Sequence, residues 1–304
     1  MSRHVPVLLK EVLEGLNLRP GVKVVDCTLG DAGHSEEILK IIGPTGKLLG
    51  IDADPESLLR AKQYLYNFNE QAIFVRDNFV NLKNILADNN FAPVDAIVMD
   101  LGWSSPQFSE RGRGFSFETD EPLDMRYGSG SMTESKTAAE ILNNYSTDEL
   151  YKIFKNLGEE KFAQEIAQAI VVNRKITPIE RTKQLVEIIL QVYREKLHSE
   201  KEIPWVGGTH PATQTFQALR IAVNDELGVL KNVLPRAVEA LAPGGRLAVI
   251  SFHSLEDRIV KQYFAGQENK TLKLINKKPI EASEEEIKNN PRARSAKLRV
   301  IEKV

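Results

Sequence analysis

The sequence predicts an α/β fold in which a parallel, doubly wound sheet is interrupted by a helical insertion. Three observations support this prediction. Short apolar segments alternate with segments of helical periodicity as far as Gly102. A glycine-containing loop follows the first apolar segment, and the second apolar segment ends in Asp52. After Gly102 the pattern changes to a polar stretch and then to several helices.

The part before Gly102 contains alternating strands and helices. Strands are expected over 23–27, 47–52, 72–75 and 94–99, and helices over about 32–42, 55–66 and 80–88. Pro55 suits the first position of its helix, because a proline lacks the N–H that would be unpaired there. Short apolar strands that alternate with helices are typical of a parallel sheet covered on both faces.

The rest of the chain is predicted as a helical insertion followed by a return to the sheet. Apolar residues recur at helical spacing over 136–198. A helix pair is expected over 213–241, a strand over 246–252 and a helix over 255–264. Two strand-like pieces follow at 271–276 and 297–301, and between them the charged stretch 281–288 is expected to be solvated. The expected domains are therefore 1–104 with 211–304 for the sheet, and 105–210 for the insertion.

Composition limits the class of protein. The chain has 304 residues, 42% of them hydrophobic and 27% charged, which is ordinary for a globular protein. A single cysteine excludes an intrachain disulfide and a multi-cysteine metal site, and no metal is expected. Without a signal peptide or an apolar run of membrane-spanning length, a cytoplasmic location is expected. The net charge of −2 does not by itself indicate a nucleic-acid partner.

Polar side chains end five successive predicted strands. They are Asp26, Asp52, Asp77 to Phe79, Asp100, and Ser251 to His253. Ligands of open α/β sheets bind beyond the carboxyl ends of the strands, so the set predicts a site at this edge. Any single member could instead cap a helix or begin a loop.

The loop after the first strand predicts a nucleoside cofactor. Helix N-terminal N–H groups around Ala32, Gly33 and His34 suit a carboxylate, Asp52 suits a ribose diol, and Phe79 suits an adenine. S-adenosylmethionine has these groups. A dinucleotide also has a ribose for Asp52, so a nicotinamide-dependent dehydrogenase stays open as an alternative.

The segment after the fourth strand has the residues that a base-amine pocket needs. An exocyclic base amine is a poor nucleophile, and acceptor oxygens such as those of Asp100 can orient it toward a methyl donor. Pro106 beside an aromatic residue could wall a flipped base. His253 is a second acid/base candidate, with capping of the helix 255–264 as the alternative.

Many separate motifs in the same order identify a family. They lie at 4–9, 26–35, 77–79, 100–107, 113–117, 122–126, 210–213, 215–221, 251–261 and 290–299. On these motifs the chain resembles, over nearly its whole length, the MraW/RsmH family of bacterial 16S ribosomal RNA cytosine-N4 methyltransferases.

The resemblance implies a class I, Rossmann-like methyltransferase domain with an inserted helical domain for substrate recognition. It implies transfer of one methyl from S-adenosylmethionine to N4 of a cytosine near the ribosomal P site, conventionally numbered 1402, in the assembled small subunit. The implied cofactor-binding residues are Ala32, Gly33, His34, Asp52, Phe79, Asp100 and Gln107.

Several positions depart from the family pattern. Asp31 adds a negative charge to a turn that is often richer in glycine. Trp103 replaces a small aliphatic residue, which predicts a different base pocket. Gln214 replaces an arginine, and 205–209 lacks basic residues, which weakens one candidate RNA contact.

The expected partner is 16S rRNA in the small ribosomal subunit, with neither DNA nor a membrane as a partner; a homodimer is left open. RNA contacts are expected from Trp103 and from local basic residues, chiefly Arg113, Arg126 and Arg220, with Arg111, Arg174, Lys175, Arg258, Arg292 and Arg294 as further candidates. Each arginine could instead be structurally paired, and Phe115 and Phe117 could stack on nucleotides or seat their own loop. A ribosome-assembly factor that binds without catalysis is a third alternative.

Overall fold

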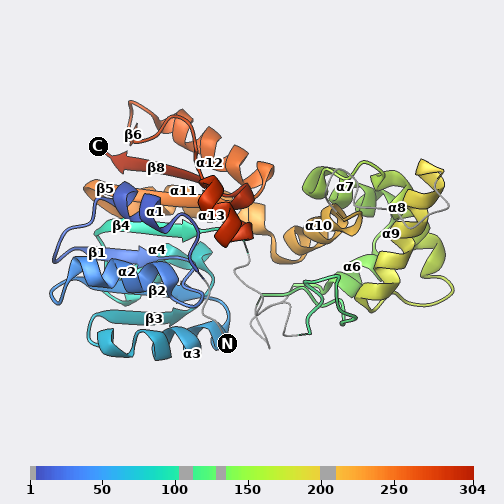
Figure 1. The fold of residues 1–304 in the computed structure, drawn as a ribbon, viewed down its shortest axis with the longest axis horizontal. Helices are drawn as coiled ribbons and strands as arrows, with labels where there is room; N and C mark the ends of the chain where they lie inside the picture. The colour runs from blue at the N-terminus through green and yellow to red at the C-terminus, as the bar shows by residue number, and fades with distance from the viewer. Residues whose placement is uncertain (1–4, 103–111, 128–134, 199–209) are drawn as a thin grey trace. The chain divides into compact units, whose positions relative to one another are not determined.

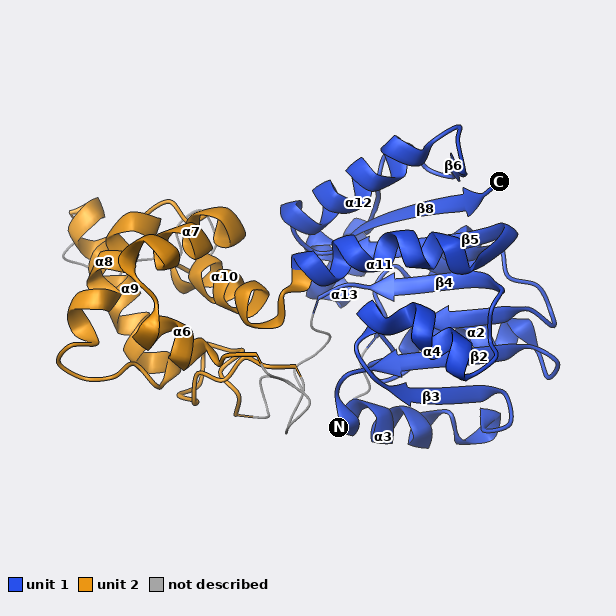
Figure 2. Ribbon diagram, turned by 180° about the vertical axis from the view of Figure 1, so that it is seen from behind, with its two compact units in different colours: residues 1–103, 227–304 blue, residues 104–226 orange. Residues whose placement is uncertain are grey.

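The computed structural model describes residues 5–102, 112–127, 135–198 and 210–304. They divide into two compact units, which are coloured separately in Figure 2. Unit 1 comprises 1–103 and 227–304, and unit 2 comprises 104–226. Within the described ranges, no helix combines the length and the apolar character that crossing a bilayer requires.

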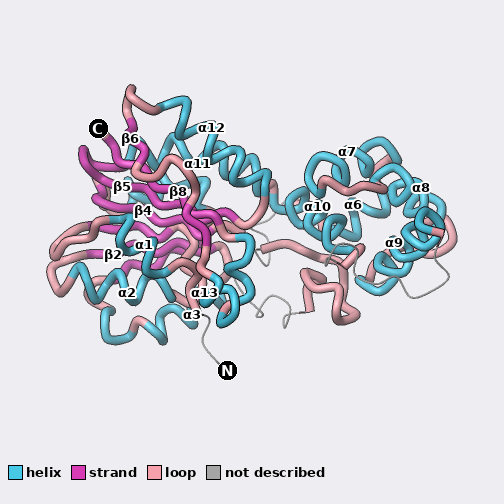
Figure 3. Tube along the Cα trace, turned by 45° about the horizontal axis from the view of Figure 1, so that its top comes forward, coloured by secondary structure: helices cyan, strands magenta, loops and turns pink. Residues whose placement is uncertain are grey.

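Unit 1 is built on one sheet with the order β3-β2-β1-β4-β5-β8-β6, and β7 pairs with β8 (Figures 1 and 3). The strands are β1 (Lys23–Asp26), β2 (Lys47–Asp52), β3 (Ala72–Arg76), β4 (Val94–Asp100), β5 (Leu241–Ser251), β6 (Leu272–Leu274), β7 (Ile280–Glu281) and β8 (Lys297–Lys303). The strands β1 to β5 pair in parallel, and β8 runs antiparallel to β5, β6 and β7.

Helices cover both faces of this sheet. One face packs against α1 (Leu9–Leu16), α2 (Gly33–Ile42) and α3 (Pro55–Tyr64), and the other against α4 (Leu82–Asp88), α11 (Glu226–Ala240) and α12 (Ser254–Gln267). Figures 1 and 2 view these two faces from opposite sides. The remaining short elements of the unit are η1 (Tyr66–Phe68), η2 (Phe79–Asn81), α13 (Glu284–Asn289) and η3 (Pro291–Ser295).

The alternation of strand side chains explains the two-sided core. Val24 and Leu48 are buried on the α1–α3 side, whereas their chain neighbours Val25 and Leu49 are buried on the other side. Successive side chains of a strand point to opposite faces, so a strand buried on both faces is a continuous apolar run. The predicted doubly wound sheet is therefore confirmed.

The structure differs from the predicted elements in several places. Strand β8 is antiparallel, so the C-terminal part of the sheet is not parallel as expected. Helix α1 was not predicted. The charged stretch 281–288 was expected to be solvated; its residues are exposed or partly exposed, and it contains the end of β7 and most of α13. Ser283 caps α13 by accepting from the Glu286 N–H. A serine before a run of glutamates is a typical helix start, which the sequence analysis did not use.

Unit 2 consists of helices and the irregular segments that join them. The helices are α6 (Ala138–Asn144), α7 (Thr147–Gly158), α8 (Ala163–Asn173), α9 (Thr182–Leu197) and α10 (Ala212–Asn224). Thr137 with Glu140, and Ser146 with Glu149, form reciprocal capping boxes at the starts of α6 and α7.

The insertion ends later than predicted. Residues 211–226 were assigned to the sheet domain, but α10 groups with the helical unit, which ends at Glu226. The physical reason is close packing of α7 on α10. A Cβ placed on Gly158 would lie only 2.5 Å from the Gln214 carbonyl oxygen, so the absence of a side chain lets the two helices approach.

Candidate functional site

Acidic side chains from three neighbouring parallel strands lie at one edge of the unit 1 sheet. Asp26 ends β1, Asp52 ends β2 and Asp100 ends β4. Ser251 ends β5 at the same edge, because Asp100 is paired with Ile250 in the parallel β4–β5 ladder. The structure thus brings these strand ends together as the sequence predicted, and the site is built from them.

The loop between β1 and α2 is tied to all three acidic strand ends. The Thr28 N–H donates to Asp26 Oδ1 at 3.0 Å, and the Thr28 hydroxyl accepts from the Asp100 N–H at 2.7 Å. The Gly30 N–H donates to Asp52 Oδ2 at 2.9 Å. At the start of α2, the Ser35 hydroxyl donates to Asp26 Oδ2 at 2.7 Å. These bonds fix the path of the loop and hence the position of the α2 N-terminus.

The backbone of this loop requires unusual conformations. Gly30 and Ala32 both have positive φ, 51° and 59°. Glycine adopts this region freely, whereas an alanine there is uncommon. The turn places the N-terminus of α2 directly after Ala32, where the first N–H groups of the helix, which have no intrahelical partner, can bind an anion.

Asp52 is oriented by backbone donors. Besides the bond from Gly30, its Oδ1 accepts from the Asp54 N–H at 2.8 Å. Burial raises the pKa of Asp52 to about 6, although both backbone hydrogen bonds oppose the shift. A carboxylate held in this way keeps lone pairs for further donors, which is the arrangement a ribose diol needs.

Asp100 has an oxygen that is ready for a donor. Its Oδ1 is buried and has no hydrogen-bond partner among the described residues, while Oδ2 lies 3.8 Å from Nδ1 of His34. Burial raises the pKa of Asp100 to about 6; His34 opposes this shift, and the charges of Asp26 and Glu256 reinforce it. Buried polar atoms are normally paired, so this oxygen points to a ligand.

The charge of Asp31 is paired. Its Oδ1 lies 2.8 Å from Nε of Arg60 on α3, and its side chain is only 5% exposed. The Arg60 guanidinium also donates to the Ser57 hydroxyl at 3.1 Å, and that hydroxyl donates to Asp54. The added negative charge that the sequence indicated is therefore paired with a cation from the neighbouring helix.

Of the remaining residues predicted to contact the cofactor or the base, the structure describes Phe79 but not Gln107 or Trp103. Phe79 opens η2 three residues after the last residue of β3 and packs partly buried against the core. Asn78 caps that turn by accepting from the Val80 N–H at 2.9 Å. Gln107 and Trp103 lie outside the described residues.

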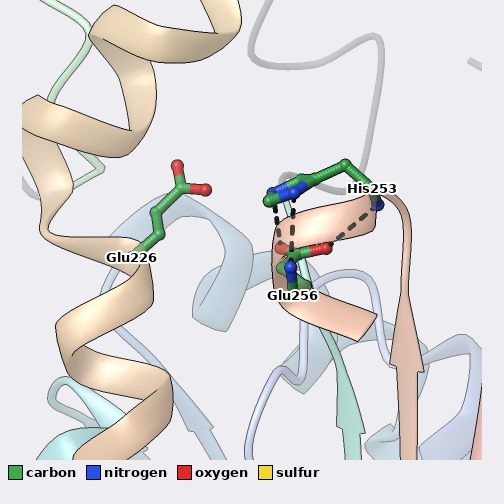
Figure 4. A group of neighbouring side chains, drawn as sticks. All are labelled: Glu226, His253 and Glu256. Carbon is green, nitrogen blue, oxygen red and sulfur yellow. Dashed lines mark hydrogen bonds and ion pairs between the residues drawn. The ribbon is translucent and has the colours of Figure 1, made fainter. Parts of the chain in front are cut away.

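His253 caps a helix (Figure 4). Its Nδ1 accepts from the Glu256 N–H at 3.4 Å, and Glu256 Oε2 accepts from the Phe252 N–H at 2.8 Å. The Glu256 carboxylate also lies 3.3 Å from His253 Nε2. These contacts favour the capping alternative, and the acid/base role of His253 stays a prediction.

The three chief arginine candidates are engaged within unit 2. Arg113 donates to the Arg126 and Tyr127 carbonyls, Arg126 forms a two-point ion pair with Asp124, and Arg220 forms one with Glu226. These contacts agree with the structurally paired alternative. Arg111 lies outside the described residues.

The two phenylalanines of the same unit pack on its aromatic side chains. Phe115 is buried and stacks on Tyr127, with ring centroids 5.7 Å apart. Phe117 stacks on His210 at 4.6 Å and meets the edge of Phe216. These contacts favour the interpretation that the rings seat their own loop.

Sequence reasoning missed the residues that support the acidic edge. Thr28 and Ser35 lie inside the glycine-loop motif, and a hydroxyl two residues from a buried aspartate was an available signal. The Val7 carbonyl, which lies 3.0 Å from His34 Nε2, gave no signal because backbone groups are identical in every residue.

Comparison with known proteins identifies relatives over the full chain. A family model described as the MraW methylase family matches residues 1–304. A protein of Heliobacterium modesticaldum named ribosomal RNA small subunit methyltransferase H is 45% identical over 318 residues, covering 99% of this chain and 98% of the relative. Proteins of the same name from Clostridium botulinum and Dehalococcoides mccartyi are 45% and 44% identical, covering 99% of this chain and 99% and 86% of those relatives.

Proposed function

Because the chain belongs to the MraW methylase family, we propose that it transfers a methyl group from S-adenosylmethionine to N4 of a cytosine in 16S rRNA of the small ribosomal subunit. The names of the relatives support a small-subunit rRNA substrate. The choice of cytosine N4, near the ribosomal P site, rests on the motif resemblance and on the chemistry of the acidic edge.

The residues present fit S-adenosylmethionine. The N–H groups of Gly33 and His34 at the start of α2 would receive the methionine carboxylate. Asp52, already oriented by two backbone donors, would accept from the ribose hydroxyls. Phe79 would contact the adenine, together with Gln107. When bound, the cofactor supplies an electrophilic methyl group on a sulfonium.

One observation carries the proposal: the buried Oδ1 of Asp100 lacks a partner among the described residues. The lone pair of a cytosine amine is delocalised into its ring, so the enzyme must hold the N–H groups and direct the nitrogen at the methyl carbon. An acceptor oxygen fixed at the end of β4 performs this task by orientation and by electrostatic stabilisation of the charge that develops on nitrogen.

The ionisation of Asp100 suits this role. With a pKa of about 6, the carboxyl is mostly ionised above pH 7 and can accept from both N–H groups of an incoming amine. Below pH 6 it is protonated and becomes a poorer acceptor. The methyl-transfer rate is therefore expected to fall as the pH drops through about 6.

RNA recognition is assigned to unit 2 by the same proposal. Its chief arginines hold their own loop segments, so their effect on RNA would be to shape the unit as well as to contact phosphate. Lys175, an exposed residue that follows the C-cap of α8, is a basic residue for direct phosphate contact.

The test is the variant Asp100→Asn with purified small subunits as substrate. An amide keeps the size of the side chain but replaces one acceptor oxygen by a donor, so the single-turnover rate should fall by about 100-fold or more. Calorimetry measures S-adenosylmethionine binding to the variant, so that the two rates are compared with the cofactor at saturation. Asp88→Asn, an exposed aspartate at the end of α4, is the matched control and should methylate at the wild-type rate.

An unchanged rate in Asp100→Asn, with normal cofactor binding, would show that Asp100 does not orient the amine. Stable binding to small subunits without any methyl incorporation by the wild type would favour an assembly factor instead. Binding of a nicotinamide dinucleotide in place of S-adenosylmethionine would favour the dehydrogenase alternative.

A further inference from the structure

A histidine at the start of α2 is held between a backbone carbonyl and Asp100. His34 Nε2 lies 3.0 Å from the Val7 carbonyl oxygen, and His34 Nδ1 lies 3.8 Å from Asp100 Oδ2. The two side chains are only 7% and 12% exposed. A carbonyl oxygen can only accept, so Nε2 carries the hydrogen, and Nδ1 is the ring atom that faces the carboxylate. Only the imidazolium, which has a hydrogen on both ring nitrogens, can donate to the Val7 carbonyl and to Asp100 Oδ2 together.

The chain fixes the orientation of this ring from its far side. Val7 belongs to the segment before α1, and this segment is anchored to the C-terminal region. The Leu8 N–H donates to Glu286 Oε1 at 2.7 Å, and the Asn290 amide donates to the Val5 carbonyl at 3.1 Å. Pro6, between them, packs against Gly33 at the α2 N-terminus. The Val7 carbonyl is thereby placed where it can hold the imidazole.

The other groups that act electrostatically on Asp100 are acidic. Asp26, at the end of β1, and Glu256, on the first turn of α12, both carry negative charge when ionised and disfavour ionisation of Asp100. His34, on the first turn of α2, has the opposite influence. Asp26 already accepts from Thr28 and Ser35, and His34 lowers the pKa of Asp26 as well.

We propose that His34 is a positioning residue that acts through Asp100: as an imidazolium it donates from Nε2 to the Val7 carbonyl and from Nδ1 to Asp100 Oδ2, which leaves Oδ1 for the substrate amine. This inference rests on the proposed function, because it assumes that Asp100 receives the amine. The 3.8 Å separation is long for a hydrogen bond, and catalytic contacts of this kind commonly tighten when the substrate binds. The backbone N–H of the same residue serves the cofactor, so His34 would couple the two halves of the site.

The test is the pH dependence of methyl transfer by His34→Gln and His34→Phe. Gln retains a donor for the Val7 carbonyl, whereas Phe retains only the ring volume. Loss of the imidazole removes the influence that lowers the pKa of Asp100, so the acid limb of the profile of kcat/KM for small subunits should move to higher pH. A move of about one pH unit corresponds to about a tenfold loss below the limb and little loss at pH 9. His198→Gln, an exposed histidine at the end of α9, is the matched control and should leave the profile unchanged.

Two further measurements separate a positioning role from a structural one. Calorimetric binding of S-adenosylmethionine and the thermal midpoint should stay near the wild-type values in His34→Gln. In the background of Asp100→Asn, His34→Gln should produce no additional shift of the acid limb, because the group through which it acts is gone.

Equal loss of rate at every pH, with the acid limb in place, would overturn the inference and assign His34 a structural role. A wild-type profile in both His34 variants would overturn it too, and would leave the role of Asp100 intact. Failure of the proposed function has a different signature, since the wild-type protein would then incorporate no methyl group into small subunits. A fully active Asp100→Asn would remove the role of Asp100 and with it this inference.

Discussion

The acidic residues at the sheet edge are buried, which removes the water that would stabilise their charged form. Asp26, Asp52 and Asp100 are buried within one part of the fold, and burial raises the pKa of each above its ordinary value. Hydrogen bonds from the Ser35 hydroxyl to Asp26 and from the Gly30 N–H to Asp52 offset part of the cost of burying these two charges. Asp100 keeps a buried oxygen without a hydrogen-bond partner among the described residues, so a ligand that donates a hydrogen bond to this oxygen would stabilise its charge.

Replacement of Asp100 by Asn is expected to make the folded protein more stable at neutral pH. A group whose pKa is raised by folding favours the folded state below its unfolded value of 3.8, and that contribution is lost as the pH rises through about 6. At pH 7.5 the neutral amide avoids this loss, a gain on the order of 1 to 3 kcal/mol in the free energy of unfolding. Chemical denaturation measures it.

The same experiment at pH 4 provides the control. There the wild-type carboxyl is mostly protonated when folded, so the advantage of Asp100→Asn should largely disappear. A gain of the same size at both pH values, or a loss of stability at pH 7.5, would contradict the assigned burial of this charge.

At the scale of the elements, the glycine loop is braced by α3 as well as by its own sheet. Asp31 in the loop pairs with Arg60, and Arg60 reaches Ser57, which bonds Asp54. The Asp54 N–H in turn donates to Asp52. A continuous series of contacts therefore joins the turn proposed for the cofactor carboxylate to Asp52, the predicted ribose acceptor.

Removal of Arg60 is expected to weaken cofactor binding without any change in the residues that contact the cofactor. Arg60→Ala leaves Asp31 without this cation in the loop that is proposed to bind the cofactor carboxylate. The dissociation constant for S-adenosylmethionine should rise roughly three- to 30-fold, and Asp31→Ala in the same chain should restore part of the affinity, as expected for coupled residues. Calorimetry on both single variants and the double variant measures this coupling.

Independent, additive effects of the two substitutions would show that the ion pair does not support the cofactor site. Arg60→Lys is the matched control, since it keeps the charge and should retain most of the affinity.

The elements of unit 1 could be predicted from sequence wherever a local pattern decides them. Strands such as β1 and β4 are apolar runs buried on both faces, and they were predicted within a residue of their observed ends. The direction of β8 was not predictable, because antiparallel pairing with β5 depends on the path of the chain between them. Likewise, an arginine such as Arg220 has the same local sequence whether it binds RNA or pairs with Glu226.

In the candidate site too, some features follow from the sequence pattern and others depend on contacts between distant parts of the chain. The convergence of Asp26, Asp52 and Asp100 follows from the parallel topology, which the alternation of strands and helices predicts. The contacts of His34 do not follow from it. They depend on the N-terminal segment and on α13, elements that lie far apart in the sequence and meet only in the folded unit.

At the scale of the whole molecule, the proposed cofactor site and the proposed RNA-binding part lie in different units. Unit 1 contains the acidic edge and the loop that suits a nucleoside cofactor, and unit 2 is a separately packed set of helices with its own buried contacts. The helical unit includes α10, so the segment that carries Arg220 belongs with the proposed RNA-binding part and not with the sheet. Membership of the MraW methylase family over residues 1–304 makes both units part of one enzyme.

The most direct test is to map the methyl group. The wild-type protein is incubated with labelled S-adenosylmethionine and either purified small subunits or naked 16S RNA, and the modified nucleotide is identified by nuclease digestion and mass spectrometry. We expect one methyl on N4 of a single cytosine near the ribosomal P site, with assembled subunits preferred over naked RNA. A methyl group on another atom or another base, or no incorporation into either substrate, would contradict it.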